Sequence, residues 1–258
     1  MRIAVCIKQV PDTETKIKLN SDNSGIDPTG IKWVVNPYDE HAIEESIKLR
    51  DANPGSTITA FTIGLKPRAS EVLRTALAMG VDEAVAVDSP NYLDASLTAK
   101  ALAGAIKKEG AFDLVLTGKL AIDDNAASVS QMLANELSVP HATVISKLTL
   151  SGASVVVERE VEGGTKEILE LSLPALVAAN KGLNMPRYAS LPGIMKAKKK
   201  VIKEFTLSDV GVDGGKNKVI YSHYKLPAEK PAVKILAGDC ASQTKELAKL
   251  LREEAKVI

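Results

Sequence analysis

Thr57-Ile-Thr-Ala-Phe-Thr-Ile-Gly-Leu-Lys-Pro-Arg-Ala-Ser-Glu-Val-Leu-Arg-Thr-Ala-Leu-Ala-Met-Gly80 contains one complete strand-to-helix unit. Residues 57–63 are mostly β-branched and aromatic, which predicts a buried strand that ends at Gly64. Pro67 suits the first turn of the following helix, and Gly80 suits its end. Between them, apolar residues recur at helical spacing on one face, at Val72, Ala76 and Met79.

The same alternation extends through the first two-thirds of the chain. Strands are predicted at residues 3–7, 84–87 and 114–116, and helices at residues 93–108 and 125–137. A further helix is predicted to begin at Asn36-Pro37, since asparagine is a good N-cap and proline suits the first helical position. Strand–helix alternation of this kind predicts an α/β fold, a doubly wound, mostly parallel, Rossmann-like sheet covered on both faces.

The pattern changes after Pro140. Residues 155–161 and 167–173 alternate apolar and polar side chains around Gly163-Gly164, which predicts an added β-hairpin. Residues 175–179 predict another buried strand, residues 181–200 a loop, and residues 211–232 an extended arm. A last helix is predicted at residues 242–256, capped by Ser242. We therefore expect three regions: an α/β nucleotide-binding domain (1–182), a loop with a basic segment (183–203), and a C-terminal arm with a helix (204–258).

Composition excludes several classes of function. The 258 residues carry a net charge of +1, so no overall field favours nucleic acid. Only three Phe and one Trp are present, which does not favour an aromatic platform for base stacking. No stretch approaches the roughly 20 apolar residues of a membrane span. Because residues 2–8 already read as a strand and no signal peptide is evident, we expect a cytoplasmic protein without membrane insertion. The three histidines and two cysteines are scattered, so neither a metal site nor a hydrolase triad is indicated.

The strongest binding candidate is the segment 118–129, which follows a predicted strand and enters a predicted helix. The N–H groups at a helix N-terminus suit a phosphate. Alternatively, the segment is an ordinary connection with Asp123 or Asp124 as the helix N-cap. Asn36 likewise has a purely structural interpretation as a cap, and Cys6 as a small buried apolar residue.

Two stretches resemble the beta subunits of electron-transfer flavoproteins. The first is Val157-Glu-Arg-Glu-Val-Glu-Gly-Gly-Thr-Lys-Glu-Ile-Leu-Glu-Leu-Ser-Leu-Pro-Ala-Leu-Val-Ala178, and the second is Leu183-Asn-Met-Pro-Arg-Tyr-Ala-Ser-Leu-Pro-Gly-Ile-Met-Lys-Ala-Lys-Lys-Lys200. The resemblance implies a heterodimer whose alpha subunit carries most of the FAD site, while this chain holds an AMP. Electrons would arrive from acyl-CoA dehydrogenases or similar flavoenzymes and leave to a quinone reductase or another acceptor. The resemblance thus implies an electron carrier without catalytic residues of its own.

The resemblance also implies which residues form the sites. The nucleotide and flavin would contact Cys6, Asn36, Tyr38, Asp39, Gly64, Gly118, Asp123, Asp124, Asn125, Ala126, Ala127, Ser128 and Val129. The docking of electron-transfer partners would use Leu191 as an anchor in an apolar pocket, with Tyr188 beside it. Lys196 and Lys199, in a basic run, would steer acidic partners by speeding encounter.

The nucleotide segment departs from the usual pattern of the AMP-type members. Ala127 and Val129 replace an asparagine and a threonine, so two side-chain phosphate donors are missing, while backbone N–H groups and Ser128 remain. One alternative is an electron-bifurcating relative with a second FAD in place of AMP and an NADH site, although Asp124 stands where those members have glycine. Another is a stand-alone nucleotide-binding regulator or ATP-splitting enzyme, but residues 8–12 lack the phosphate loop of those enzymes.

Overall fold

The computed structural model describes residues 1–212, 216–230 and 232–258, and they divide into two compact units. The sheet unit contains Met1–Ile17 and Asp27–Ser222, and the arm unit contains Lys18–Ile26 and His223–Ile258. The predicted arm at residues 211–232 includes residues 213–215 and 231, which lie outside the described residues.

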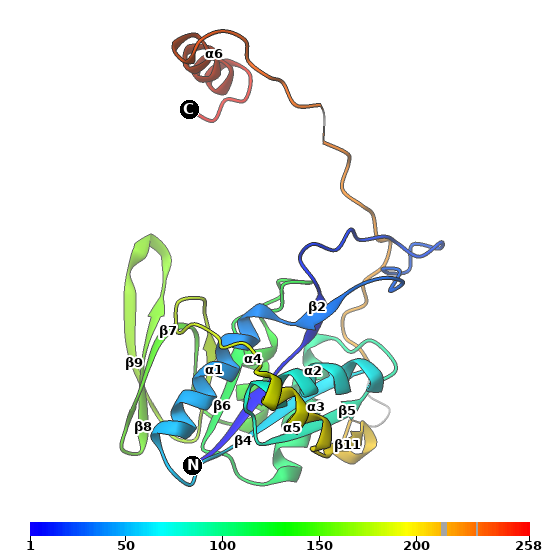
Figure 1. Ribbon diagram of the computed structural model, residues 1–258, viewed down its shortest axis with the longest axis vertical. Helices are drawn as coiled ribbons and strands as arrows, with labels where there is room; N and C mark the ends of the chain where they lie inside the picture. Colours follow the sequence, from blue (N-terminus) through cyan, green and yellow to red (C-terminus); the bar gives the residue numbers. More distant parts are fainter. Residues whose placement is uncertain (213–215, 231) are drawn as a thin grey trace. The chain divides into compact units, whose positions relative to one another are not determined.

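A nine-stranded sheet, in the order β11-β5-β4-β1-β6-β10-β7-β8-β9, forms the centre of the sheet unit (Figure 1). The strands from β11 to β7 pair in parallel, and β7, β8 and β9 pair antiparallel. The bounds are β1 Arg2–Cys6, β4 Thr57–Gly64, β5 Glu83–Asp88, β6 Leu114–Gly118, β7 His141–Ser151, β8 Ser154–Glu160, β9 Lys166–Ser172, β10 Ala175–Ala179 and β11 Ile202–Thr206. The predicted doubly wound sheet with an added hairpin is confirmed. A separate antiparallel pair joins β2 (Gln9–Pro11) to β3 (Trp33–Val35).

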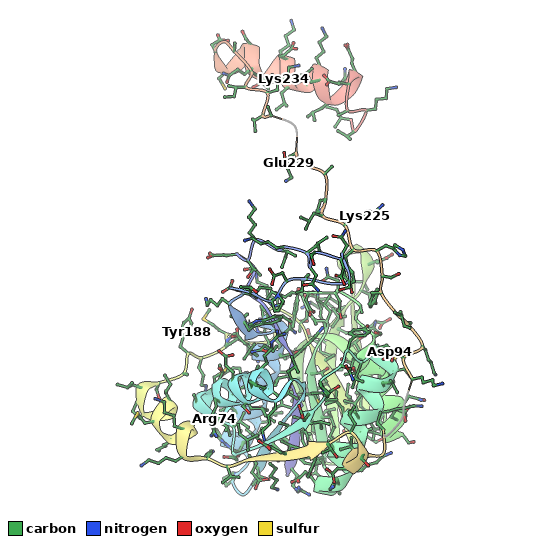
Figure 2. All side chains as sticks on the ribbon, turned by 90° about the vertical axis from the view of Figure 1, so that its right-hand side faces the viewer. Arg74, Asp94, Tyr188, Lys225, Glu229 and Lys234 are labelled. Carbon is green, nitrogen blue, oxygen red and sulfur yellow. The ribbon has the colours of Figure 1, made fainter. Side chains whose placement is uncertain are left out.

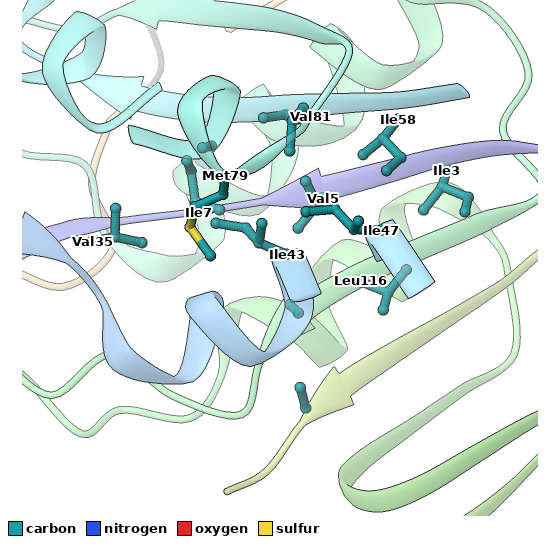
Figure 3. Close-up of a cluster of buried hydrophobic side chains, with 14 of the residues drawn as sticks. Ile3, Val5, Ile7, Val35, Ile43, Ile47, Ile58, Met79, Val81 and Leu116 are labelled. Carbon is teal, nitrogen blue, oxygen red and sulfur yellow. The ribbon is translucent and has the colours of Figure 1, made fainter. Parts of the chain in front are cut away.

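Helices cover both faces of the sheet, as its buried parallel strands require. One apolar cluster contains the inward residues of α1 (Pro37–Ala52) and α2 (Lys66–Met79), and the other contains those of α3 (Ala95–Glu109) and α4 (Val129–Leu137). Figure 3 shows Ile43 and Ile47 of α1 against Ile3 and Val5 of β1. Complete burial of each such side chain is worth about 1.5–3 kcal/mol, so this packing holds the helices on the sheet.

Three predictions about helices were wrong in part. The helix predicted at residues 125–137 begins only at Val129. The last helix, α6 (Cys240–Glu253), is capped by Asp239, whose side chain accepts from the Ser242 N–H, and not by Ser242. The loop predicted at residues 181–200 contains a helix, α5 (Leu191–Lys199), because Ser190 caps its first turn and Pro192 suits that turn.

Four strands were not predicted: the short pair β2 and β3, and two strands of the main sheet, β7 and β11. β7 lies beside β10, and its 11 residues continue into the antiparallel hairpin. β11 adds a parallel edge strand beside β5 through the pairing of residues more than a hundred positions apart in the sequence. Neither pairing leaves a strong local signal, because lysine and other polar residues interrupt both stretches. Two short 3₁₀ turns, Glu162–Gly164 and Ser208–Val210, complete the sheet unit.

Candidate nucleotide site and docking surface

The carboxyl ends of three neighbouring parallel strands bring together residues that the sequence singled out. Cys6 ends β1, Gly64 ends β4 and Gly118 ends β6, and β1 pairs with both of its neighbours in parallel. Ligands of open α/β sheets bind beyond this edge. This edge of the sheet is therefore the candidate position for a ligand.

Asp39, in the first turn of α1, ties this edge to the helix. Its two carboxylate oxygens accept from two different strand ends, one from the Lys8 N–H at 2.7 Å and the other from the Gly118 N–H at 3.0 Å. The side chain is buried, and burial raises the pKa of the carboxyl to about 7, while the N–H donors act in the opposite direction. Asp39 thus fixes the spacing of the β1 and β6 ends.

Gly118 is the residue that permits this contact. A Cβ at this position would lie 2.3 Å from Asp39 Oδ1 and 2.7 Å from Tyr38 Cβ. The backbone carbonyl carbon of Tyr38 would also lie at 2.8 Å, so no side-chain rotation would relieve the clash. A glycine is therefore required where β6 passes the N-terminus of α1.

Asn36 has a tertiary role instead of capping its own helix. It occupies the N-cap position of α1 but makes no capping bond with its side chain. Its amide donates to the Leu120 carbonyl at 2.8 Å and accepts from the Ile122 N–H at 3.2 Å. The prediction of a helix start at Asn36-Pro37 is confirmed, and the side chain secures the first part of the segment 119–128.

The middle of that segment is shaped by Asp124 and by an ion-pair cluster. Asp124 accepts from the Ala126 N–H at 3.0 Å, and two residues without glycine's freedom, Asn125 and Ala127, have φ of 51° and 48°. Lys8 Nζ pairs with Asp123 at 2.8 Å and with Asp124 at 3.1 Å. Burial lowers the pKa of Lys8, but these two carboxylates outweigh it and hold that pKa above its ordinary value.

Helix α4 begins immediately after this segment. Ser128 holds the N-cap position, so neither Asp123 nor Asp124 is the helix cap that the structural alternative required. The Ser128 side chain makes no capping bond, and the first N–H groups of any helix lack intrahelical partners. Behind them, the buried hydroxyls of Thr117 and Ser130 lie 2.7 Å apart and close the junction of β6 with α4.

Two further candidates line the same edge. The Lys119 ammonium lies 4.9 Å from the centroid of the Tyr38 ring, close enough for a cation–π contact. Cys6 is buried, and burial together with the nearby Asp39 raises the pKa of its thiol above the ordinary value. The thiol is therefore held neutral, as expected of a small residue packed at a strand end.

The predicted docking residues lie on α5 and on the segment before it. Tyr188 (97% exposed) and Leu191 (74%) present apolar surface to solvent, and Tyr188 lies beside α5 in Figure 2. Leu191 is the first residue of the helix and not part of a loop. Lys196 and Lys199 lie in its last turn, where positive charge complements the helix dipole.

Two negative findings apply to the described parts of the chain. No group of three or more His, Cys, Asp or Glu side chains has the arrangement to hold a metal ion. None of the helices described is long and apolar enough to cross a membrane.

Comparison with known proteins identifies the family. The model of the "Electron transfer flavoprotein domain" family matches residues 25–210. The chain belongs to the electron transfer flavoprotein family, among its beta subunits. It is 44% identical over 262 residues to electron transfer flavoprotein subunit beta of Bacillus subtilis, covering 100% of both chains. The corresponding beta subunits of Bos taurus and Homo sapiens are 39% and 38% identical over 255 residues, covering 97% of this chain and 99% of each relative.

Sequence reasoning missed two lysines of this candidate site, Lys8 and Lys119. Lys8 is the cation that pairs with Asp123 and Asp124. A lysine directly after a buried strand, on the edge where ligands bind, was the available signal.

Proposed function

We propose that the chain is the beta subunit of a heterodimeric electron-transfer flavoprotein that holds AMP at the segment 118–129. In this role it supports an FAD carried mainly by the alpha subunit. The observation that carries the proposal is the junction of β6 with α4. There, Asn36 and Asp39 fix the start of the segment, and the open N-terminus of α4 ends it.

The chemistry of this junction fits an adenine nucleotide. The first-turn N–H groups of α4 and the hydroxyl of Ser128 are donors suited to a phosphate. Because Lys8 pairs with both Asp123 and Asp124, a phosphate would not face two uncompensated carboxylates. Those carboxylates can accept from ribose or adenine donors, and Ala127 and Val129 leave phosphate binding mainly to the main chain.

The proposed electron donors are acyl-CoA dehydrogenases or similar flavoenzymes, and the proposed acceptor is a quinone reductase or another acceptor. Leu191, on α5, and Tyr188, just before it, supply exposed apolar side chains. Lys196 and Lys199 supply positive charge in the last turn of the same helix. An apolar anchor inside a charged rim is typical of an interface in which the anchor supplies affinity and the rim speeds encounter.

Of the predicted C-terminal region 204–258, residues 204–206 lie in β11 and the sheet unit extends to Ser222. We further propose that the remaining part, His223–Ile258, packs on the alpha subunit. Helix α6 has no buried residue, and Val233, Ile235 and Leu247 are exposed. A segment of this kind does not offset its own ordering entropy unless it covers another surface. Limited proteolysis tests this point: residues 223–258 should be cut rapidly in the chain expressed alone and protected in the heterodimer. Protection in a monodisperse isolated chain would contradict it.

The second candidate is an electron-bifurcating beta subunit that holds a second FAD in place of AMP, with an NADH site nearby. Its support is local, since Ala127 and Val129 match that class. The stand-alone regulator has no supporting observation beyond the fold itself.

The small molecules released from the purified heterodimer separate these candidates. After denaturation, chromatography and mass spectrometry should find one FAD and one AMP per heterodimer. Two FAD would move the chain to the bifurcating class. The absence of any adenine nucleotide besides one FAD would remove the assignment of residues 118–129.

A further inference from the structure

The segment between β10 and α5, residues 180–190, has no helix or strand, yet a buried acid holds it on α1. Glu44 is only 6% exposed and accepts three hydrogen bonds from Arg187. The Arg187 backbone N–H lies 3.2 Å from Oε2, its Nε lies 2.7 Å from the same oxygen, and its Nη2 lies 2.9 Å from Oε1. This two-oxygen pairing fixes both the backbone and the guanidinium plane of Arg187.

Asn184 provides a second attachment to the same helix. Its amide nitrogen donates to the His41 carbonyl and to Glu45 Oε2, each at 2.9 Å, and its oxygen lies 3.1 Å from His41 Nδ1. His41, Glu44 and Glu45 share one side of α1 because residues three and four apart are neighbours on a helix. The segment is thus attached at two points three residues apart.

The other end of the docking surface is held by α2. A Cβ on Gly193 would lie 2.3 Å from the Ala78 carbonyl oxygen, so α5 lies in close backbone contact with α2. The Arg74 guanidinium donates to the carbonyls of Ala197 and Lys200 at the end of α5 (Figure 2). Tyr188 and Leu191 lie between these two attachments and project freely into solvent.

The gain in stability from this pair is small. The Arg187 side chain is 42% exposed, and an ion pair with one partner in contact with water contributes little to the free energy of unfolding. What a pair with this geometry supplies is a fixed conformation, and a preorganised surface loses less entropy when a partner binds.

We propose that Glu44, acting through Arg187, is a positioning residue for partner docking that holds residues 183–190 in the docking conformation before the partner arrives. The proposal rests on the proposed function of Leu191 and Tyr188. Neither Glu44 nor Arg187 touches the partner or a cofactor in this scheme; both act through the segment that carries the apolar side chains.

Hydrogen exchange of the heterodimer tests the positioning without any electron-transfer partner. Glu44→Gln and Arg187→Lys should each speed amide exchange in residues 183–190 by about tenfold, because lysine keeps the charge but not the two-oxygen geometry. The control, Lys108→Gln, removes an exposed ion pair with Asp209 on the opposite face of the sheet and should change nothing in this segment. Unchanged exchange in Glu44→Gln would overturn the proposal, and so would loss of FAD or of the heterodimer, since the pair would then be structural.

Stopped-flow reduction by an acyl-CoA dehydrogenase, itself reduced with its acyl-CoA substrate, tests the consequence. Glu44→Gln should lower the second-order rate constant by about threefold to tenfold and leave the limiting rate at saturating dehydrogenase unchanged. Leu191→Ala should lower the second-order rate constant by a smaller factor in the Glu44→Gln background than in the wild type, because Glu44→Gln has already released residues 183–190 from their docking conformation. Strict additivity, or a fall of the limiting rate, would overturn the positioning role. If the wild-type protein is not reduced at all, the proposed donor is wrong, and the exchange experiment still decides the positioning.

Discussion

Asp94 in the sheet unit and Asp239 in the arm unit are both helix N-caps, but one is buried and the other is exposed. Each caps a helix by accepting from the N–H three residues ahead, at 2.9 Å in both cases. Asp94 is 2% exposed and also accepts from the N–H groups of Lys218 and Val219, while Asp239 is exposed.

The helices that follow the two caps differ in the same way. α3 buries seven side chains, among them Leu97, Leu102 and Ile106, whereas α6 buries none. A helix of about 14 residues is marginal in water without packing. The difference indicates that a cap determines where a helix begins, whereas the packing of that helix determines how much stability is lost when the cap is removed.

The largest expected effect concerns a third helix-start aspartate, Asp39. Its pKa is about 7 in the folded chain and ordinary, 3.8, in the unfolded one. Between these values the folded state binds a proton that the unfolded state has released, so this group makes the unfolding free energy fall as pH rises from about 4 to about 7. At about 1.4 kcal/mol per unit, the upper bound is about 4 kcal/mol.

Denaturant unfolding of wild-type protein and Asp39→Asn at intervals from pH 4.5 to 8 measures this effect. The unfolding free energy of the wild type minus that of the variant should decrease as pH rises toward 7 and then stay constant. Taking the difference cancels groups that titrate equally in both proteins. A difference independent of pH would mean that burial does not shift this carboxyl.

Asp94→Ala should have the next largest effect. It leaves three backbone N–H groups, those of Leu97, Lys218 and Val219, without their acceptor. Since each buried unpaired donor costs about 1–3 kcal/mol, partly relieved by water, we expect a loss of about 3 kcal/mol. Thermal unfolding measures the loss, and proteolysis near residue 218 should become faster. A loss no greater than that of an exposed cap would contradict the comparison.

Leu191→Ala tests an exposed apolar residue of the sheet unit. Burying one leucine on binding is worth about 1.5–3 kcal/mol, which corresponds to roughly ten- to hundredfold in affinity. Coupling to the dehydrogenase should weaken by that factor, mostly through faster dissociation, with unchanged melting temperature and FAD content. The control, Leu133→Ala, truncates a fully buried leucine of α4 and should lower the melting temperature. Unchanged partner affinity in Leu191→Ala would show that this segment only connects β10 to β11.

Asp239→Ala should have the smallest effect. Loss of the Asp239 side chain should speed amide exchange in the first turn of α6 and leave the melting temperature of the sheet unit unaltered, because the cap is exposed and α6 has no buried residue. Hydrogen exchange by mass spectrometry resolves the two units. In the heterodimer the effect should be smaller still, as packing takes over from capping. A drop in the melting temperature as large as that of Asp94→Ala would contradict the distinction between the two caps.

The sequence by itself determined the features that depend on neighbouring residues. Examples are the strand–helix unit at residues 57–80, the end of its helix at Gly80 and the hairpin around Gly163-Gly164. They follow from the spacing of apolar residues and from the residues that favour turns, and both act over a few positions. The α/β class followed from repeating that pattern. The predicted strands end near Cys6 and Gly64, where β1 and β4 end in the structure.

Only the tertiary structure decided how those ends meet. Asp39 accepts from an N–H 79 positions away, and Lys8 pairs with carboxylates 115 and 116 positions away. The need for glycine at residue 118 exists only because Tyr38 and Asp39 lie against it. The sequence of α5 predicts a loop because it contains Pro192 and Gly193 and its apolar residues show no clear helical periodicity. Close contact with α2 favours the helix instead. Local patterns report the conformations that a segment favours, whereas contacts between distant segments depend on the packing of the whole sheet.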